Sequence, residues 1–180
     1  SEIGDFIRKK NMRISMHPDQ FNVLNTQKKK VLENTIRELK YHADLLDSMG
    51  LDETAKFQIH VGGVYGNKKK SMRRFIGRYR KLNQNIKKRL VIENDGRSYT
   101  LRDCLRINKH TGVPVLLDLF HRRLNSSGED VKSSLSKAAK TWKKKDGMPM
   151  IDYSSGNLNG KKEGSHAQTI DIKDFNKFIR

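Results

Sequence analysis

The sequence is poor in cysteine and has no long hydrophobic run. Cys104 is the only thiol among 180 residues, so no intrachain disulfide can form, and we expect a reducing compartment, the cytoplasm. Cys104 lies within an apolar helical pattern, which predicts a core position. No apolar stretch approaches the 18 residues that a membrane-spanning helix needs, and the N-terminal residues do not resemble a signal peptide. We therefore expect a protein without a membrane span.

Acidic residues are also scarce. Asp and Glu number 20 against 38 Lys and Arg, which gives a formal net charge of +18. Proteins this basic usually bind a polyanion, and nucleic acid is the first candidate. The alternative is a surface of lysines that only improves solubility. The excess is partly clustered, in segments 28–30, 68–70, 87–89, 143–145 and 161–162. Only the fold decides whether these clusters form one positive face.

Hydrophobic patterns along the chain predict five strands that alternate with helices. The strands are expected over residues 12–16, 56–63, 89–95, 113–121 and 148–154. The helices are expected over residues 28–49, 69–86, 100–112 and 131–142, with a last helix starting near 171. Such alternation predicts an α/β fold with a parallel sheet covered by helices, either an open doubly wound sheet or a (β/α)₈ barrel. No glycine-rich phosphate-binding fingerprint is present.

Every predicted strand ends on side chains that can bind a metal ion or carry a proton. These candidates are His17, His60, Glu93 with Asp95, Asp118 with His121, and Asp152, and His166 follows in the loop after the fifth strand. In α/β folds, functional side chains collect at the carboxyl ends of the strands. Taken singly, a histidine there is more often structural, and an aspartate is often a helix cap. His42 and His110 fall within helical patterns, and we expect both to be structural or at the surface.

The chemistry of these candidates points to divalent ions. Imidazole together with several carboxylates suits zinc, manganese or iron, with a preference for harder ions. One ion needs three or four ligands, so this set predicts two or more ions in one cluster. Metal ions beneath a basic surface suggest phosphodiester hydrolysis, and we expect His60, Glu93 and Asp118 to be the catalytic residues.

Five segments together resemble the UV damage endonuclease family, over about Arg13 to Phe175. They read "RISMHPDQF", "HVGGVYGNKKKSMRRF", "RLVIENDGR", "GVPVLLDLFHRR" and "GSHAQTID". The family consists of metal-dependent TIM-barrel enzymes related in architecture to endonuclease IV. The resemblance implies a DNA repair endonuclease that nicks damaged double-stranded DNA on the 5′ side of UV photoproducts and other lesions. It also implies a cofactor of two or three divalent ions, with manganese as the expected metal.

The resemblance carries over to single positions. The metal ligands it implies are His17, His60, Glu93, Asp118, His121 and His166, and Asp152 can serve as a further ligand. Gln20 and Phe21 match a glutamine–aromatic pair that probes the duplex at the lesion, where poor stacking lowers the cost of opening the helix. On chemistry alone, Phe21 could instead be a buried loop anchor. We expect further DNA contacts from Tyr65, Lys68, Lys69 and Arg122.

The sequence departs from the family pattern at several points. Met150 and Asp152 stand where many members have a lysine and a histidine, and Arg122 stands where many have a second histidine. A full barrel takes about 250 residues and eight strands. We therefore expect residues 1–180 to be a single domain of about five central βα units, without the first strands and the last strand, which carries the family's final glutamate ligand.

Such an open barrel predicts a monomer that alone is weakly active or inactive, because five tilted strands cannot close. Two other functions stay open at this point. A metal-dependent sugar isomerase on a similar barrel would also use histidine and carboxylate at strand ends. A non-catalytic DNA-binding remnant of the endonuclease family would bind duplex without cutting it.

Overall fold

The computed structural model describes residues 1–157 and 164–179. Its strands are β1 (Ser15–Met16), β2 (Lys56–His60), β3 (Leu90–Glu93), β4 (Val115–Asp118) and β5 (Ile151–Asp152). Its helices are α1 (Glu2–Lys9), α2 (Lys29–Ser48), α3 (Lys68–Lys81), α4 (Gln84–Lys87), α5 (Leu101–Thr111), α6 (Leu119–Leu124), α7 (Val131–Ala139) and α8 (Ile172–Phe178), with a 3₁₀ turn η1 (Lys144–Asp146). No helix in the described part of the chain has the length and apolar character needed to cross a membrane.

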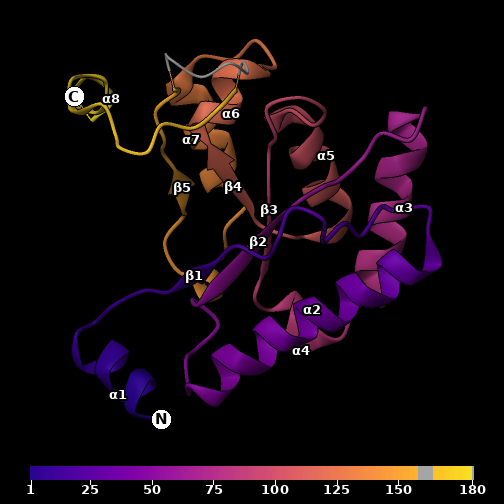
Figure 1. Cartoon of the computed structure of the whole chain (residues 1–180), viewed down its shortest axis with the longest axis vertical. Coiled ribbons are helices and arrows are strands. Elements are labelled where there is room, and N and C mark those ends of the chain that lie inside the picture. Colours follow the sequence, from indigo (N-terminus) through magenta and orange to yellow (C-terminus); the bar gives the residue numbers. More distant parts are fainter. Residues whose placement is uncertain (158–163, 180) are drawn as a thin grey trace.

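The five strands are parallel and lie in the order β1-β2-β3-β4-β5. They curl into half of a TIM-type barrel, with the long helices α2, α3 and α5 outside the sheet (Figure 1). The α/β barrel-type fold predicted from the sequence is therefore confirmed. Sequential order with parallel pairing brings all strand ends to one edge, and this edge carries the candidate site.

Alternation along the strands separates two layers. In β2, Phe57 and Ile59 point outward and pack in the core between sheet and helices, while Lys56, Gln58 and His60 point inside the curve. The outer layer is the main apolar core. It also contains Cys104, which is fully buried as predicted.

A buried ion pair fastens the base of the half-barrel. Lys56 Nζ lies 2.7 Å from Asp146 Oδ1, and the Lys56 side chain is 1% exposed. Arg13 donates to the carbonyl oxygens of Thr54 at 3.0 Å and Asp146 at 2.8 Å. Removing one partner of such a buried pair leaves an uncompensated charge, which costs about 3–5 kcal/mol. These contacts tie β1 and β2 to the segment that leads into β5.

The edge strands are shorter than predicted. The patterns over 12–16 and 148–154 form only the two-residue strands β1 and β5. Each of them pairs with one neighbour within the described residues, so side-chain contacts such as those of Arg13 replace a second hydrogen-bonded ladder there.

Three further features differ from the prediction: the end of one strand, the length of one helix and the presence of α1. The predicted strand 113–121 ends at Asp118, because that side chain accepts from the His121 backbone N–H at 2.8 Å and starts α6. The predicted helix 69–86 breaks at Leu82, where extended backbone separates α3 from α4. The helix α1 was not predicted, and Ser1 caps it by accepting from the Gly4 N–H.

Candidate metal centre at the strand ends

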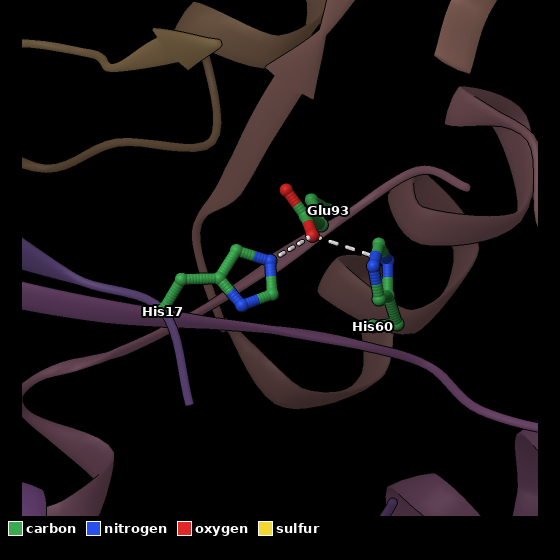
Figure 2. A group of neighbouring side chains, drawn as sticks. All are labelled: His17, His60 and Glu93. Atoms are coloured by element: carbon green, nitrogen blue, oxygen red, sulfur yellow. Dashed lines mark hydrogen bonds and ion pairs between the residues drawn. The ribbon is translucent and has the colours of Figure 1, made fainter. Parts of the chain in front are cut away.

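Three side chains from three consecutive strands meet at the mouth of the half-barrel. Glu93 Oε1 lies 2.7 Å from His17 Nε2 and 3.1 Å from His60 Nδ1 (Figure 2). His60 and Glu93 end β2 and β3 and are register partners, and His17 follows β1 directly. Both imidazoles approach the same carboxylate oxygen, as expected for side chains that could share one cation.

Two buried polar atoms in this group lack a hydrogen bond within the described residues. They are Glu93 Oε2, on a side chain that is 1% exposed, and His60 Nδ1, which lies near Glu93 without good hydrogen-bond alignment. An unpartnered buried carboxylate oxygen costs free energy unless another group compensates it. A divalent cation would compensate both atoms, so the donor set fits a metal ion.

Proton equilibria in the group follow from these contacts. The hydrogen bond to Glu93 raises the pKa of His17 to about 9 against the opposing effect of burial. Burial lowers the pKa of His60 and outweighs the attraction of Glu93. Burial alone would raise the pKa of Glu93, but the His17 hydrogen bond and the nearby imidazoles lower it. These shifts favour an ionised Glu93 and a protonated His17, so a cation that bound at His17 would have to displace a proton.

A second group of donors shares Glu93. Oxygen atoms of Glu93, Asp118 and Asp152 all lie within 4.8 Å of one another. Burial, reinforced by the two neighbouring carboxylates, raises the pKa of Asp152 to about 6. Burial also raises the pKa of Asp118. Three carboxylates this close repel one another without a cation, so this group suits a hard divalent ion.

His121 and His166 complete the mouth. His121 Nδ1 lies 3.0 Å from Asp118 Oδ2, and the ring of His166 lies 5.6 Å from that of His121 and 4.7 Å from that of Phe120. An isolated bridge to Gly156 holds the His166 backbone. All seven side chains predicted as metal ligands line one cavity of about 600 Å³: His17, His60, Glu93, Asp118, His121, Asp152 and His166. Their role as ligands stays a prediction.

The loop after β1 carries the predicted lesion probe beside this cavity. Gln20 lines both the metal cavity and an adjoining cavity of about 940 Å³, which also shares His60 and His121. Phe21 is 75% exposed. The alternative of a buried loop anchor is therefore wrong, and an exposed aromatic side chain stands next to the candidate centre.

The other side chains predicted to contact DNA differ in whether they already have partners inside the fold. Tyr65 is exposed, with the Arg74 guanidinium 5.4 Å from its ring centroid, and Lys69 is exposed as well. Lys68 Nζ instead lies 2.5 Å from Asp103 Oδ2. Arg122 donates to Ser134 Oγ at 2.9 Å and to the Glu129 carbonyl oxygen. Lys68 and Arg122 thus hold parts of the fold together, and their contact with DNA stays a prediction.

Two supporting residues were missed by the sequence analysis. Asn94 is fully buried and bridges β3 to β4: it donates to the Asp118 carbonyl oxygen at 2.9 Å and accepts from the Asp118 N–H at 3.0 Å. Gln58 donates to Asp152 Oδ2. Asn94 directly follows Glu93, and Gln58 lies two residues before His60, so both positions were visible in the sequence but their partners were not.

The remaining candidates have structural roles or lie at the surface. Asp95 accepts from the backbone N–H groups of Arg97 at 2.8 Å and Tyr99 at 3.0 Å, which makes it a turn residue. His42 packs against Phe57 with ring centroids 6.0 Å apart, and His110 is exposed. The expectation for both histidines is confirmed.

Comparison with known proteins finds relatives of this chain. A curated UV DNA damage endonuclease from Clostridium perfringens is 41% identical over 175 residues, which is 96% of this chain and 42% of the relative. The crystal structure of SacUVDE aligns with a TM-score of 0.92 and 48% identity, over 99% of this chain and 60% of that chain. The chain therefore spans about half the length of the relatives it matches.

A more distant likeness concerns the fold alone. The structure of an L-ribulose 3-epimerase aligns with a TM-score of 0.63 and 17% identity, over 78% of this chain and 52% of that chain. At this identity the match supports the barrel-type fold and does not favour a sugar reaction. The family model described as UV-endonuclease UvdE matches residues 1–179. This chain belongs to the UV-endonuclease UvdE family.

Proposed function

We propose that this chain provides the catalytic centre of a DNA repair endonuclease. It nicks the phosphodiester backbone on the 5′ side of UV photoproducts and other lesions. Divalent ions are its cofactor, and manganese is the expected metal. The observation that carries the proposal is the convergence of His17 and His60 on one carboxylate oxygen of Glu93, next to the Asp118–Asp152 pair. Family membership supports damaged DNA as the substrate, and the net charge of +18 suits it.

Each side chain of the centre has a defined task in this proposal. Glu93 is the negatively charged ligand that both donor groups share. The other ligands are His17, Asp118, His121, Asp152 and His166. Divalent ions bound there would neutralise a phosphodiester and lower the pKa of an attacking water. His60, whose pKa burial lowers, offers a neutral imidazole nitrogen beside Glu93 that can bind an ion without first losing a proton. Asn94 keeps β3 and β4 in register, which fixes Glu93 relative to Asp118.

Lesion recognition is assigned to the loop after β1. Phe21 is the exposed aromatic residue next to the cavity, and Gln20 lines the cavity wall. Insertion of an aromatic side chain into a duplex costs a few kcal/mol for unstacking, and a photoproduct lowers this cost because its bases already stack poorly. Phe21 therefore contributes preference for damaged over intact DNA.

The test combines ion binding, DNA binding and nicking. Manganese binding is measured by electron paramagnetic resonance, and nicking is measured on UV-irradiated supercoiled plasmid, with and without EDTA. We expect manganese binding, preference for irradiated DNA and at most slow nicking. Ion binding should be lost in His60→Ala, and lesion preference should be lost in Phe21→Ala. A chain that neither binds manganese nor prefers irradiated DNA contradicts the proposal.

The same experiment separates the alternatives. A non-catalytic remnant, suggested by Met150, would prefer damaged DNA without nicking it in any metal at any protein concentration. A sugar isomerase would interconvert simple ketoses and aldoses with manganese and would not distinguish irradiated from intact plasmid. The exposed Phe21 beside the donor cluster favours the endonuclease over the isomerase.

A further inference from the structure

The helix α3 has an unusual charge composition. Its sequence KKKSMRRFIGRYRK contains eight lysines and arginines and no acidic residue. Some of these cations are used inside the fold. Lys68 pairs with Asp103, Arg74 Nε donates to the Asn25 carbonyl oxygen at 2.9 Å, and Arg78 donates to the Leu24 carbonyl oxygen at 2.7 Å.

The other cations lie together on the solvent side. At 3.6 residues per turn, one arc of about 120° contains Lys69, Lys70, Arg73, Gly77, Arg80 and Lys81, and we call this surface the α3 outer face. All six residues are exposed. Within the described part of the chain, the side chains of Lys69, Lys70, Arg73 and Lys81 have no ion-pair or hydrogen-bond partner, and the Arg80 side chain donates to the His110 carbonyl oxygen at 3.0 Å.

The start of α2 extends this positive surface. Lys28, Lys29 and Lys30 begin α2, whose first turn contains no acidic residue. Arg78 of α3 also donates to the Thr26 carbonyl oxygen, two residues before Lys28, so the start of α2 lies beside α3 (Figure 1). Segment 28–30 therefore lies near the end of α3 that carries Arg78, and segment 68–70 lies at the start of the same helix.

This surface is separate from the candidate metal centre. None of the residues lining the two cavities at the mouth belongs to the α3 outer face or to segment 28–30. The helix α3 lies on the outer side of the sheet (Figure 1), whereas the metal-ligand candidates that line the cavities lie at the carboxyl ends of the strands. A partner bound to this face contacts neither the donor cluster nor Phe21.

The chemistry of the face selects its partner. Protein interfaces are enriched in aromatic anchors and depleted in lysine, whereas contacts with DNA backbone come largely from lysine and arginine. The α3 outer face carries only cations and one glycine. From Lys69 to Lys81 it extends about 18 Å, which matches roughly five base pairs of duplex.

We propose that the α3 outer face and segment 28–30 bind the phosphate backbone of double-stranded DNA independently of damage. This surface holds intact duplex while the loop after β1 tests for lesions. The inference rests on the proposed function for the choice of DNA as the partner. It predicts that affinity and lesion preference are set by different parts of the molecule.

Gly77 offers a direct test at the centre of the face. A Cβ atom at Gly77 would meet no atom within 4 Å, so a side chain can be added without a clash. Glycine inside a helix costs about 1 kcal/mol relative to alanine, so such variants should fold at least as well as the natural chain. Gly77→Glu introduces a negative charge, Gly77→Gln is its neutral match, and Gly77→Lys adds a positive charge. Ser136→Glu places the same negative charge on the exposed surface of α7.

Binding is measured by fluorescence anisotropy in EDTA over a range of sodium chloride concentrations. The probes are an intact 20-base-pair duplex and the same duplex with one UV photoproduct. We expect Gly77→Glu to weaken binding of both duplexes by the same factor, about three- to tenfold, and to reduce the salt slope by about 1. Gly77→Gln and Ser136→Glu should stay within twofold of the natural chain, and Gly77→Lys should bind more tightly. Phe21→Ala should change only the ratio between the two duplexes.

Three results would overturn the inference. The first is that Gly77→Glu and Gly77→Gln bind duplex with equal affinity. The second is that Ser136→Glu weakens duplex binding as much as Gly77→Glu does. The third is that Gly77→Glu weakens binding to anionic phospholipid vesicles but not to duplex. Since EDTA removes divalent ions, these measurements do not depend on catalysis. A chain that neither binds manganese nor prefers irradiated DNA, with the Gly77→Glu effect intact, would reject the proposed function and leave the DNA-binding face in place.

Discussion

At the scale of single residues, Glu93 is the centre of the molecule's chemistry. Its side chain belongs to both donor groups, with His17 and His60 on one side and Asp118 and Asp152 on the other. Its burial is tolerable because two imidazoles and a potential cation compensate the charge. Changes at these positions should therefore affect ion binding before they affect the fold.

Replacing His60 should weaken manganese binding strongly. We expect His60→Ala to raise the dissociation constant at least tenfold, because one of the few donors at the shared Glu93 oxygen is lost. Electron paramagnetic resonance of free manganese measures this. His110→Ala, on an exposed helical histidine, is the matched control and should bind as the natural chain does. Equal affinities of the two variants would argue against His60 as a ligand.

Gln58 should act on the same centre through Asp152. The amide donates to the Asp152 carboxylate from inside the barrel, so Gln58→Met, which keeps the volume, removes the hydrogen bond and leaves the carboxylate free to turn. We expect manganese affinity to fall about tenfold, as for other residues that orient metal ligands. When Asp152 is already replaced in Asp152→Asn, adding Gln58→Met should reduce manganese affinity much less than it does in the natural chain. If the effects of the two substitutions on the binding free energy were fully additive in a double-mutant cycle, Gln58 would not act through Asp152.

At the scale of elements, the junction between α2 and β3 shows how charge fixes packing. Arg89, 1% exposed, precedes β3 and donates to Asp47 near the end of α2 at 2.6 Å and 3.1 Å. Lys88 adds a contact of 3.0 Å to the same carboxylate. The clamp sets where α2 ends relative to the strand that carries Glu93, and the position of the metal centre thus depends on a contact at the other end of the strand.

Breaking this clamp should destabilise the chain in a pH-dependent way. Partial burial alone would raise the pKa of Asp47, but the hydrogen bonds from Arg89 and Lys88 outweigh it and lower that pKa. A carboxylate with a lowered pKa stabilises the fold above its unfolded pKa of about 4, and this contribution is lost as the pH falls through the folded value. We expect Asp47→Asn to reduce the free energy of unfolding by about 2 kcal/mol at pH 7 and by less at acid pH.

Urea unfolding at several pH values measures the effect of Asp47→Asn. Asp44→Asn is the control, since the Asp44 side chain pairs with Lys40 on the exposed side of α2 and should contribute less than about 0.5 kcal/mol. A difference between Asp47→Asn and the natural chain that does not shrink towards acid pH would contradict the assignment.

At the scale of the whole molecule, the donors connect distant parts of the chain. The candidate ligands run from His17 to His166 and come from the ends of all five strands and the loop that follows. An ion bound there links segments that are far apart in the sequence. Metal binding should consequently stabilise the native state as a whole.

Manganese should therefore raise the melting temperature. At 100 times the dissociation constant, a ligand that binds only the native state adds about 2.7 kcal/mol, which corresponds to about 5–10 °C for a domain of this size. Differential scanning fluorimetry measures the shift. EDTA should reverse it, and His60→Ala should show a much smaller one. A shift unchanged in His60→Ala would place the ion elsewhere.

Local sequence determined much of the architecture. Periods of 2 and 3.6 residues predicted five strand–helix units. The helix expected over 100–112 is α5, which begins after the capping residue Thr100 and ends at Gly112, whose backbone is left-handed. The strand ends were predicted to carry the functional residues because parallel strands share an edge. These features depend on neighbours along the chain, so they can be recognised from the sequence.

Tertiary structure decided the rest. The apolar pattern did not reveal the break of α3 at Leu82, the position of His121 in α6 or the shortness of β1 and β5. The sequence determined that the chain is basic and that histidines and carboxylates end its strands. Only the fold decided that Glu93 belongs to two donor groups, that Phe21 is exposed, and that the start of α2 lies beside α3. Distances between side chains far apart in the sequence depend on how the sheet curls, and no local pattern encodes that curvature.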